Sequence, residues 1–187
     1  MKRGDVQFTT GGTGIAHSEQ NEHGEDWVHF LQIWVTPWKK GLAPNYHTRT
    51  FGEERKRSGW VTIVSPLRAG PSATPEQERA AEPAVEGSIP IHADFLMGAA
   101  MIPEGRGFGW QVGGGVAKSG RARKVFVHLP GSKKGESRVR VGGEEDKVLE
   151  EGDGAFVEGV DVGDVVSVES VGEGDAEVVL FDSNGGG

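Results

Sequence analysis

The sequence predicts an all-β protein, and three observations support that fold class. The chain carries 31 glycines and nine prolines among 187 residues, a share of turn-forming residues that is typical of short strands joined by tight turns. Short runs of β-prone residues recur along most of its length. Gly-Asp dipeptides at residues 152–153, 163–164 and 174–175 mark a turn about every ten residues. This spacing favours a β-sandwich or a β-barrel.

The first part of the chain is expected to alternate strands with turns. The strongest predicted strand is Trp-Val-His-Phe-Leu-Gln-Ile-Trp-Val-Thr at residues 27–36, which Pro37 ends. A cluster of glycines at residues 11–14 predicts a turn, and neither a Gly-Lys-Ser/Thr sequence nor a helix follows it, which argues against a phosphate-binding loop. The other strands expected here cover residues 5–10, 15–19, 46–51 and 60–65.

Residues 69–87 interrupt this pattern. They are rich in proline, alanine, glutamate and serine, which predicts a mobile loop or linker. One short helix is expected inside it, with Thr74 as the cap, Pro75 at the first helical position and an end near Ala81. The strands expected after it cover residues 88–93, 95–102, 108–112, 123–129, 137–141, 147–149, 154–157, 165–168 and 176–181.

Composition narrows the classes of function. The formal charge of −8, from 28 acidic and 20 basic side chains, disfavours a nucleic-acid partner. The chain has no cysteine, so any metal must be held by nitrogen and oxygen ligands. Neither a signal peptide nor an apolar stretch of the roughly 20 residues needed to span a bilayer is visible. We therefore expect a soluble protein, cytoplasmic or nuclear, with no membrane partner.

His17 and Glu19 are the candidate metal ligands. If residues 15–19 are extended, these two side chains point to the same face of the sheet, and an imidazole beside a carboxylate suits a transition metal. A chance His-x-Glu pair on a strand is the alternative. Ser18 faces the opposite side, so it is not expected to act as a nucleophile with His17.

Three sequence blocks carry a family resemblance. Residues 12–21, Gly-Thr-Gly-Ile-Ala-His-Ser-Glu-Gln-Asn, resemble the second cupin motif as pirins write it. Residues 27–35 resemble the next pirin strand with its Gln-Ile-Trp core, and residues 41–46, Gly-Leu-Ala-Pro-Asn-Tyr, resemble the segment that follows. The second half resembles the C-terminal pirin cupin more loosely, at residues 91–94, 125–129, 152–154 and 178–182.

The resemblance implies a bicupin made of double-stranded β-helix (cupin) barrels. An incomplete N-terminal barrel at residues 1–58 would precede a complete C-terminal barrel at residues 59–187, with the loop at 69–87 inside the second. Pirins take two further metal ligands from a His-x-His motif some forty residues before the second motif, whereas His17 is the first histidine here. The resemblance thus implies a chain truncated at its N-terminus.

The same resemblance implies a role for each candidate residue. His17 and Glu19 would bind a divalent transition metal, with iron the first expectation, and Glu19 would also act as the catalytic base on a substrate hydroxyl. Two protein ligands predict a labile site. The substrate class implied is a flavonol such as quercetin, opened by a 2,3-dioxygenase.

The remaining histidines are not expected to complete the site. His29 is expected to pack against its neighbours or to form a hydrogen bond with a metal ligand, and His23 is expected to face solvent. His47, His92 and His128 match no ligand of the family's motifs.

Three functional hypotheses stay open. The first is a quercetin 2,3-dioxygenase-like enzyme, which the missing His-x-His makes doubtful. The second is a non-catalytic interaction protein, similar to family members that assist transcription factors, with exposed strands that self-associate. The third is an inactive truncated product.

Overall fold

The computed structural model describes residues 1–26, 28–116, 122–132, 135–143 and 147–184. The predicted β-rich fold class is confirmed: strands dominate and helices are short. No helix within these ranges is both long enough and apolar enough to cross a membrane.

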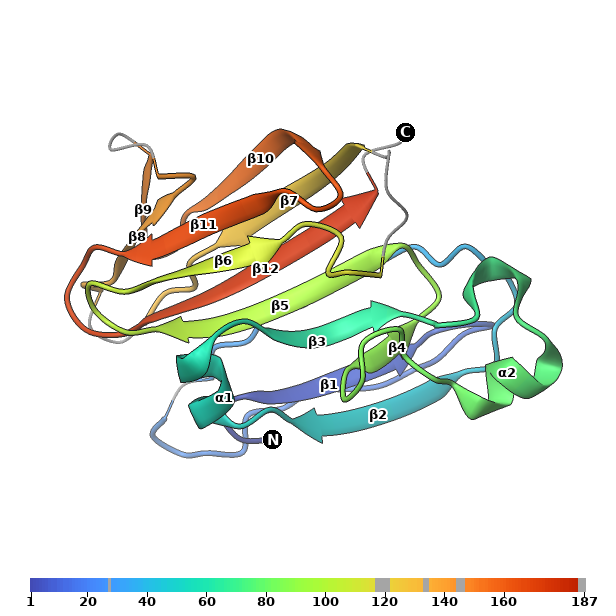
Figure 1. Cartoon of the computed structure of the whole chain (residues 1–187). Helices are drawn as coiled ribbons and strands as arrows, with labels where there is room; N and C mark the ends of the chain where they lie inside the picture. Colours follow the sequence, from blue (N-terminus) through green and yellow to red (C-terminus); the bar gives the residue numbers. More distant parts are fainter. Residues whose placement is uncertain (27, 117–121, 133–134, 144–146, 185–187) are drawn as a thin grey trace.

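Two facing sheets form the body of the molecule (Figure 1). The larger sheet has the order β10-β7-β12-β5-β3-β4 and the smaller one the order β6-β11-β8-β9. All pairings are antiparallel except that of β3 with β4. The strands are β3 (Val61–Pro66), β4 (Ile89–Ile91), β5 (Phe95–Ile102), β6 (Gly107–Gln111), β7 (Ala122–His128), β8 (Arg138–Val141), β9 (Val148–Glu150), β10 (Gly154–Asp161), β11 (Val165–Ser170) and β12 (Ala176–Asn184).

The main core lies between these two sheets. Alternate side chains of each strand point into it, as expected for strands with one buried face, and Leu96, Val127, Val168 and Leu180 are fully buried there. At the end of this core, Asp182 of β12 is buried and joins Arg123 of β7, since Nε of Arg123 donates to Oδ1 of Asp182 over 2.5 Å.

A two-stranded ribbon precedes the body. β1 (Asp5–Thr10) pairs with β2 (Asn45–Thr50) in antiparallel register, with Thr9 opposite Tyr46. One face of the ribbon, carrying Val6 and Phe8, packs on a second core cluster. This cluster also contains Phe51, Val61, Ile63, Val64, Ile89, Ile91 and Ala93.

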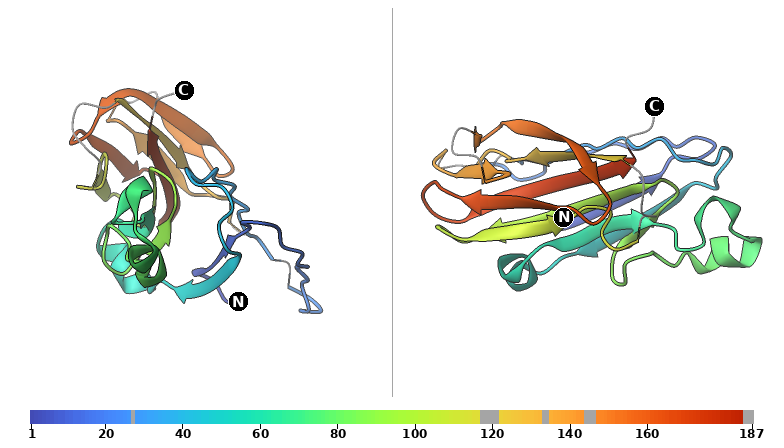
Figure 2. Two further views of the ribbon diagram at one scale, coloured as in Figure 1. Left: turned by 90° about the vertical axis from the view of Figure 1, so that its right-hand side faces the viewer. Right: turned by 45° about the horizontal axis from the view of Figure 1, so that its top comes forward.

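The N-terminal connection departs from the prediction. Residues 11–26 and 28–44 contain neither strand nor helix, so the strands expected at 15–19 and 27–36 are wrong, and Trp27 lies outside the described residues. A β-prone sequence becomes a strand only where a neighbouring strand takes up its N–H and C=O groups, and in the described structure β1 and β2 pair only with each other. Figure 2 shows the N-terminal segments projecting from the two-sheet body.

The predicted helix inside residues 69–87 is confirmed as α2 (Pro75–Ala80). The hydroxyl of Thr74 accepts from the backbone N–H of Gln77, and the Gln77 side chain accepts from the N–H of Thr74, which completes a capping box. Two further elements were not predicted, the helix α1 (Glu53–Ser58) and the short 3₁₀ helix η1 (Gly70–Ser72).

Candidate metal centre

His17 and Glu19 converge although their segment is not a strand. Nε2 of His17 lies 3.7 Å from Oε1 of Glu19, and the two side chains are 47% and 44% exposed. The prediction that these two side chains point to the same side is therefore correct, while the strand expected to carry them is missing.

His17 borders an open hollow of about 430 Å³ beside the ribbon. The face of β1 and β2 turned away from the body supplies Gln7, Thr9 and Tyr46, and the connection adds Ile15 and His17. This lining combines an aromatic ring with amide, hydroxyl and imidazole groups, which are the kinds of group that orient a flat polar ligand.

Gly12 fixes the path of the chain into this hollow. Its φ is +50°, and a Cβ at this position would lie 2.1 Å from the carbonyl oxygen of buried Leu42. The N–H of Gly14 donates to the carbonyl of Gly11 over 2.8 Å. The glycine cluster is thus a tight turn, as predicted, and it lets residues 41–44 approach closely enough to complete the hollow.

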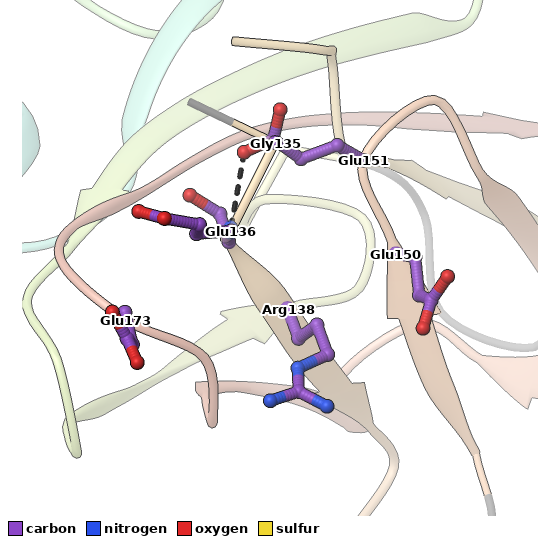
Figure 3. Close-up of a pocket in the computed structure, with 7 residues that line it drawn as sticks. Gly135, Glu136, Arg138, Glu150, Glu151 and Glu173 are labelled. Atoms are coloured by element: carbon purple, nitrogen blue, oxygen red, sulfur yellow. Dashed lines mark hydrogen bonds between the residues drawn. The ribbon is translucent and has the colours of Figure 1, made fainter. Parts of the chain in front are cut away.

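A second open hollow lies at the ends of β8 and β9 (Figure 3). Its wall includes Glu136, Arg138, Glu150, Glu151 and Glu173. Glu151 is already engaged, because it accepts hydrogen bonds from the N–H of Ser137 and from the hydroxyl of Ser132. Burial raises the pKa of Glu151, but these hydrogen bonds outweigh it and hold the pKa below its usual value. This carboxylate is already occupied by its hydrogen bonds to Ser132 and Ser137, so we assign it no role in binding a ligand.

Comparisons with known proteins bear on the first hollow. The family model described as Pirin matches residues 1–35. "Putative quercetin 2,3-dioxygenase Rv0181c" of Mycobacterium tuberculosis is 42% identical over 62 residues, which are 33% of this chain and 25% of that protein. "Quercetin 2,3-dioxygenase" of Escherichia coli K12 is 30% identical over 92 residues, which are 49% of this chain and 32% of that protein.

The fold agrees with these sequence matches. The crystal structure of the bacterial pirin YhhW from Escherichia coli in complex with nickel(II) superposes with a TM-score of 0.67 and 24% identity, covering 97% of this chain and 62% of that one. In sequence the chain is thus similar to pirins over residues 1–35, and in fold it is similar to a bacterial pirin. This pirin-like chain spans about a quarter to a third of the length of the two curated relatives it matches.

The donor set of the pirin-like chain fits a transition metal in kind but not in number. One imidazole nitrogen and one carboxylate oxygen converge, whereas stable sites use three or four protein ligands. Within the described ranges, no group of three or more His, Asp or Glu side chains is placed to hold a metal ion.

The other histidines lie apart from this pair. His29 exchanges a hydrogen bond of 3.0 Å with the carbonyl of Gly131, and His128 one of 2.8 Å with the carbonyl of Asp153. His47 contacts Asn45 and the ring of Phe8, and exposed His23 lies 3.5 Å from Asp26. Each of these four side chains thus has a contact that involves neither His17 nor Glu19.

His92 belongs to a cluster that sequence reasoning missed. Its Nε2 lies 2.6 Å from Oε2 of Glu78 on α2, and Oε1 of Glu78 accepts from Nζ of Lys39 over 2.8 Å. The N–H of Trp38 donates to the carbonyl of His92 over 2.7 Å. These contacts join three segments that are distant in sequence, so spacing alone gave no signal for them.

Proposed function

We propose that this chain is a metal-binding cupin protein related in function to quercetin 2,3-dioxygenases, with His17 and Glu19 as its protein ligands. The observation that supports the proposal best is the 3.7 Å approach of Nε2 of His17 to Oε1 of Glu19 at the edge of the hollow. The pirin match over residues 1–35 includes both residues.

The ligand class follows from the wall of the hollow. Tyr46 offers an aromatic surface, and Gln7 and Thr9 offer hydrogen-bonding groups on the same face of the ribbon. A flavonol such as quercetin presents flat rings edged with hydroxyls and carbonyls, which such a wall can bind by stacking and hydrogen bonding.

A divalent metal, iron in the first instance, would polarise the oxygen atoms of such a ligand. His17 would donate Nε2 to the ion, and the Glu19 carboxylate would bind beside it or accept the proton of a ligand hydroxyl. Two protein donors leave the rest of the coordination sphere to water. We therefore expect reversible metal binding and weak flavonol binding rather than sustained oxygenase activity.

Metal titration tests the site directly. Iron(II) under anaerobic conditions and nickel(II) are each titrated by calorimetry into the wild-type chain, His17→Ala and Glu19→Ala. We expect binding to the wild type that a chelator reverses, and a loss of about tenfold or more in affinity for each variant. The matched control is His23→Ala. His23 and Asp26 form a similar exposed pair, with 3.5 Å between Nδ1 and Oδ2, and neither residue lines the hollow.

Two outcomes would contradict the proposal. Equal metal affinity in the wild type and in the double variant H17A/E19A would show that the metal binds elsewhere. Stoichiometric metal that survives the chelator would show that the two-ligand description is wrong.

Quercetin binding, followed by fluorescence, is expected to weaken in Tyr46→Ala and to stay unchanged in His23→Ala.

A further inference from the structure

We propose that residues 28–36 form an antiparallel β-ribbon with the same residues of a second copy of this chain. The proposal does not depend on metal or flavonol binding. It rests on the composition of this segment, on its open backbone and on the register in which it can pair with itself.

The composition of the segment allows it to pair with a copy of itself. Its sequence, Val-His-Phe-Leu-Gln-Ile-Trp-Val-Thr, contains no Asp, Glu, Lys or Arg, whereas the whole chain carries a formal charge of −8. Two copies therefore repel one another over much of their surface, but not along this segment. β-branched and aromatic residues also give it high strand propensity.

The backbone of the segment is open to pairing. Residues 28–36 belong to none of the strands in the described chain, and residues 30–36 make no backbone–backbone hydrogen bond to any other described residue. A row of such N–H and C=O groups in a β-prone sequence is a template for another strand.

The exposure of the side chains alternates, as it does along an extended strand. Val28, Phe30 and Trp34 are 57%, 61% and 86% exposed, whereas Leu31 and Ile33 are 38% and 41% exposed. Val35 is partly buried against the second core cluster. The even-numbered side thus presents Val28, Phe30 and Trp34 to solvent together with the polar Gln32 and Thr36, whereas the apolar side chains of the odd-numbered side are less exposed.

Both ends of the segment are held against the body. His29 is bound to the carbonyl of Gly131 over 3.0 Å, and just after the segment the N–H of Trp38 donates to the carbonyl of His92 over 2.7 Å. An extended segment fixed at two points loses less conformational freedom when it pairs than a free one does.

The register follows from the order of the side chains. If Gln32 of one copy faces Gln32 of the other on a two-fold axis, Phe30 of each copy lies opposite Trp34 of the other. Leu31 then lies opposite Ile33, again twice. Aromatic–aromatic and aliphatic cross-strand pairs are among the favourable ones, and a two-fold axis makes the surface self-complementary.

Charge placement tests this register. We expect wild-type chains to dimerise in analytical ultracentrifugation, and Phe30→Glu with Trp34→Glu to raise the dimer dissociation constant by about tenfold or more, since like charges then face each other twice. Phe30→Lys with Trp34→Glu places opposite charges in the same positions, so association is expected to return and to weaken with salt. Because both side chains are exposed, the melting temperatures should change little and confirm that the variants fold.

Disulfide formation tests the two-fold position. The chain has no cysteine, so a single Gln32→Cys variant can crosslink only to another copy, and paired residues of antiparallel strands lie within disulfide range. We expect Gln32→Cys to give a covalent dimer on oxidation. Phe30→Cys is the matched control, because two copies of residue 30 would be roughly 13 Å apart in this register.

Several results would overturn the proposal. One is a wild-type chain that stays monomeric at all concentrations tested. A second is equal crosslinking by Gln32→Cys and Phe30→Cys. A third is a dimer that is abolished by Phe156→Glu, on the exposed aromatic residue of β10, but not by the Phe30 and Trp34 variants, because the interface would then lie on the larger sheet.

Discussion

Asp182 and Arg123 form an ion pair inside the two-sheet body, with side chains 0% and 1% exposed and 2.5 Å between Oδ1 and Nε. The other carboxylate oxygen of Asp182 accepts from Nε1 of Trp110 over 2.9 Å and from the N–H of Gly113 over 2.7 Å. Asp94 takes a second guanidinium nitrogen of Arg123 over 2.8 Å. The carboxylate thus ties β12 to β7, to β6 and to the turn after β6.

Removing the charge of Asp182 should therefore be costly. In Asp182→Asn, buried Arg123 loses its closest counter-charge, and we expect the free energy of unfolding to fall by about 3–5 kcal/mol. Urea denaturation followed by circular dichroism measures this loss. The control is Glu169→Gln in the partly exposed pair with Arg140, where a change below about 1 kcal/mol is expected. Equal effects in the two variants would contradict the prediction.

Glu78 should make stability depend on pH. Hydrogen bonds from Lys39 and then His92 hold the pKa of Glu78 below its usual value, so the folded state favours the ionised form. The resulting stability is present above the unfolded pKa and is lost as pH falls through the folded pKa. We expect Glu78→Gln to lower the free energy of unfolding by about 1 kcal/mol at pH 7. The loss should vanish at a pH where Glu78 of the wild type is protonated in both the folded and the unfolded state.

The measurement is a series of urea titrations from neutral to acid pH on the wild type and the variant. Glu82→Gln serves as the control, because its contact with Arg68 is 3.4 Å long and both side chains are mostly exposed. A stability difference for Glu78→Gln that stays constant down to strongly acid pH would rule out this role of the carboxylate.

Gly98 should not tolerate a side chain. A Cβ on this β5 residue would lie 2.6 Å from Cζ3 of Trp110, and that ring is fixed by Asp182 and by an edge contact with Trp60 at 5.8 Å. We expect Gly98→Ala to lower stability by about 1–3 kcal/mol, measured as a shift of the thermal midpoint. Gly24→Ala, which would contact no heavy atom within 4 Å, should leave the midpoint unchanged.

Thr74 should control the helix α2. Thr74→Ala removes the hydroxyl that accepts from the N–H of Gln77, which typically costs about 1 kcal/mol. We expect faster hydrogen exchange of the α2 amides with little change in β5 or β12. Thr74→Ser keeps the acceptor and should exchange like the wild type; if both variants exchange alike, the cap is not what holds the helix.

Most of the two-sheet body could be predicted from the sequence. β5 begins and ends where the apolar run at 95–102 does, and the capped helix at Thr74 has a local signature in Thr74, Pro75 and Gln77. These elements are written in contiguous residues, so pattern and turn signals suffice. The division into units at 1–58 and 59–187 remains a prediction.

The parts that could not be predicted depend on partners distant in sequence. The segment at 27–36 has a strand-like sequence, but the state of a strand depends on its neighbour. The buried pair of Arg123 and Asp182 joins residues 59 positions apart, and nothing local marks either of them as buried. The proximity of His17 to Glu19 was predictable because it needs only an extended backbone. The residues that line the hollow beside them were not predictable, because they come from separate segments of the chain.

The second core cluster has a practical consequence for anyone who shortens this chain. It seats Val6, Phe8 and Phe51 against Ile63, Ile89 and Phe95, so the ribbon serves as a lid on the outer side of the larger sheet. A fragment starting at Gly59 would keep its strands but expose this apolar surface to water. Such a fragment should aggregate, and adding the ribbon as a separate peptide should restore its solubility.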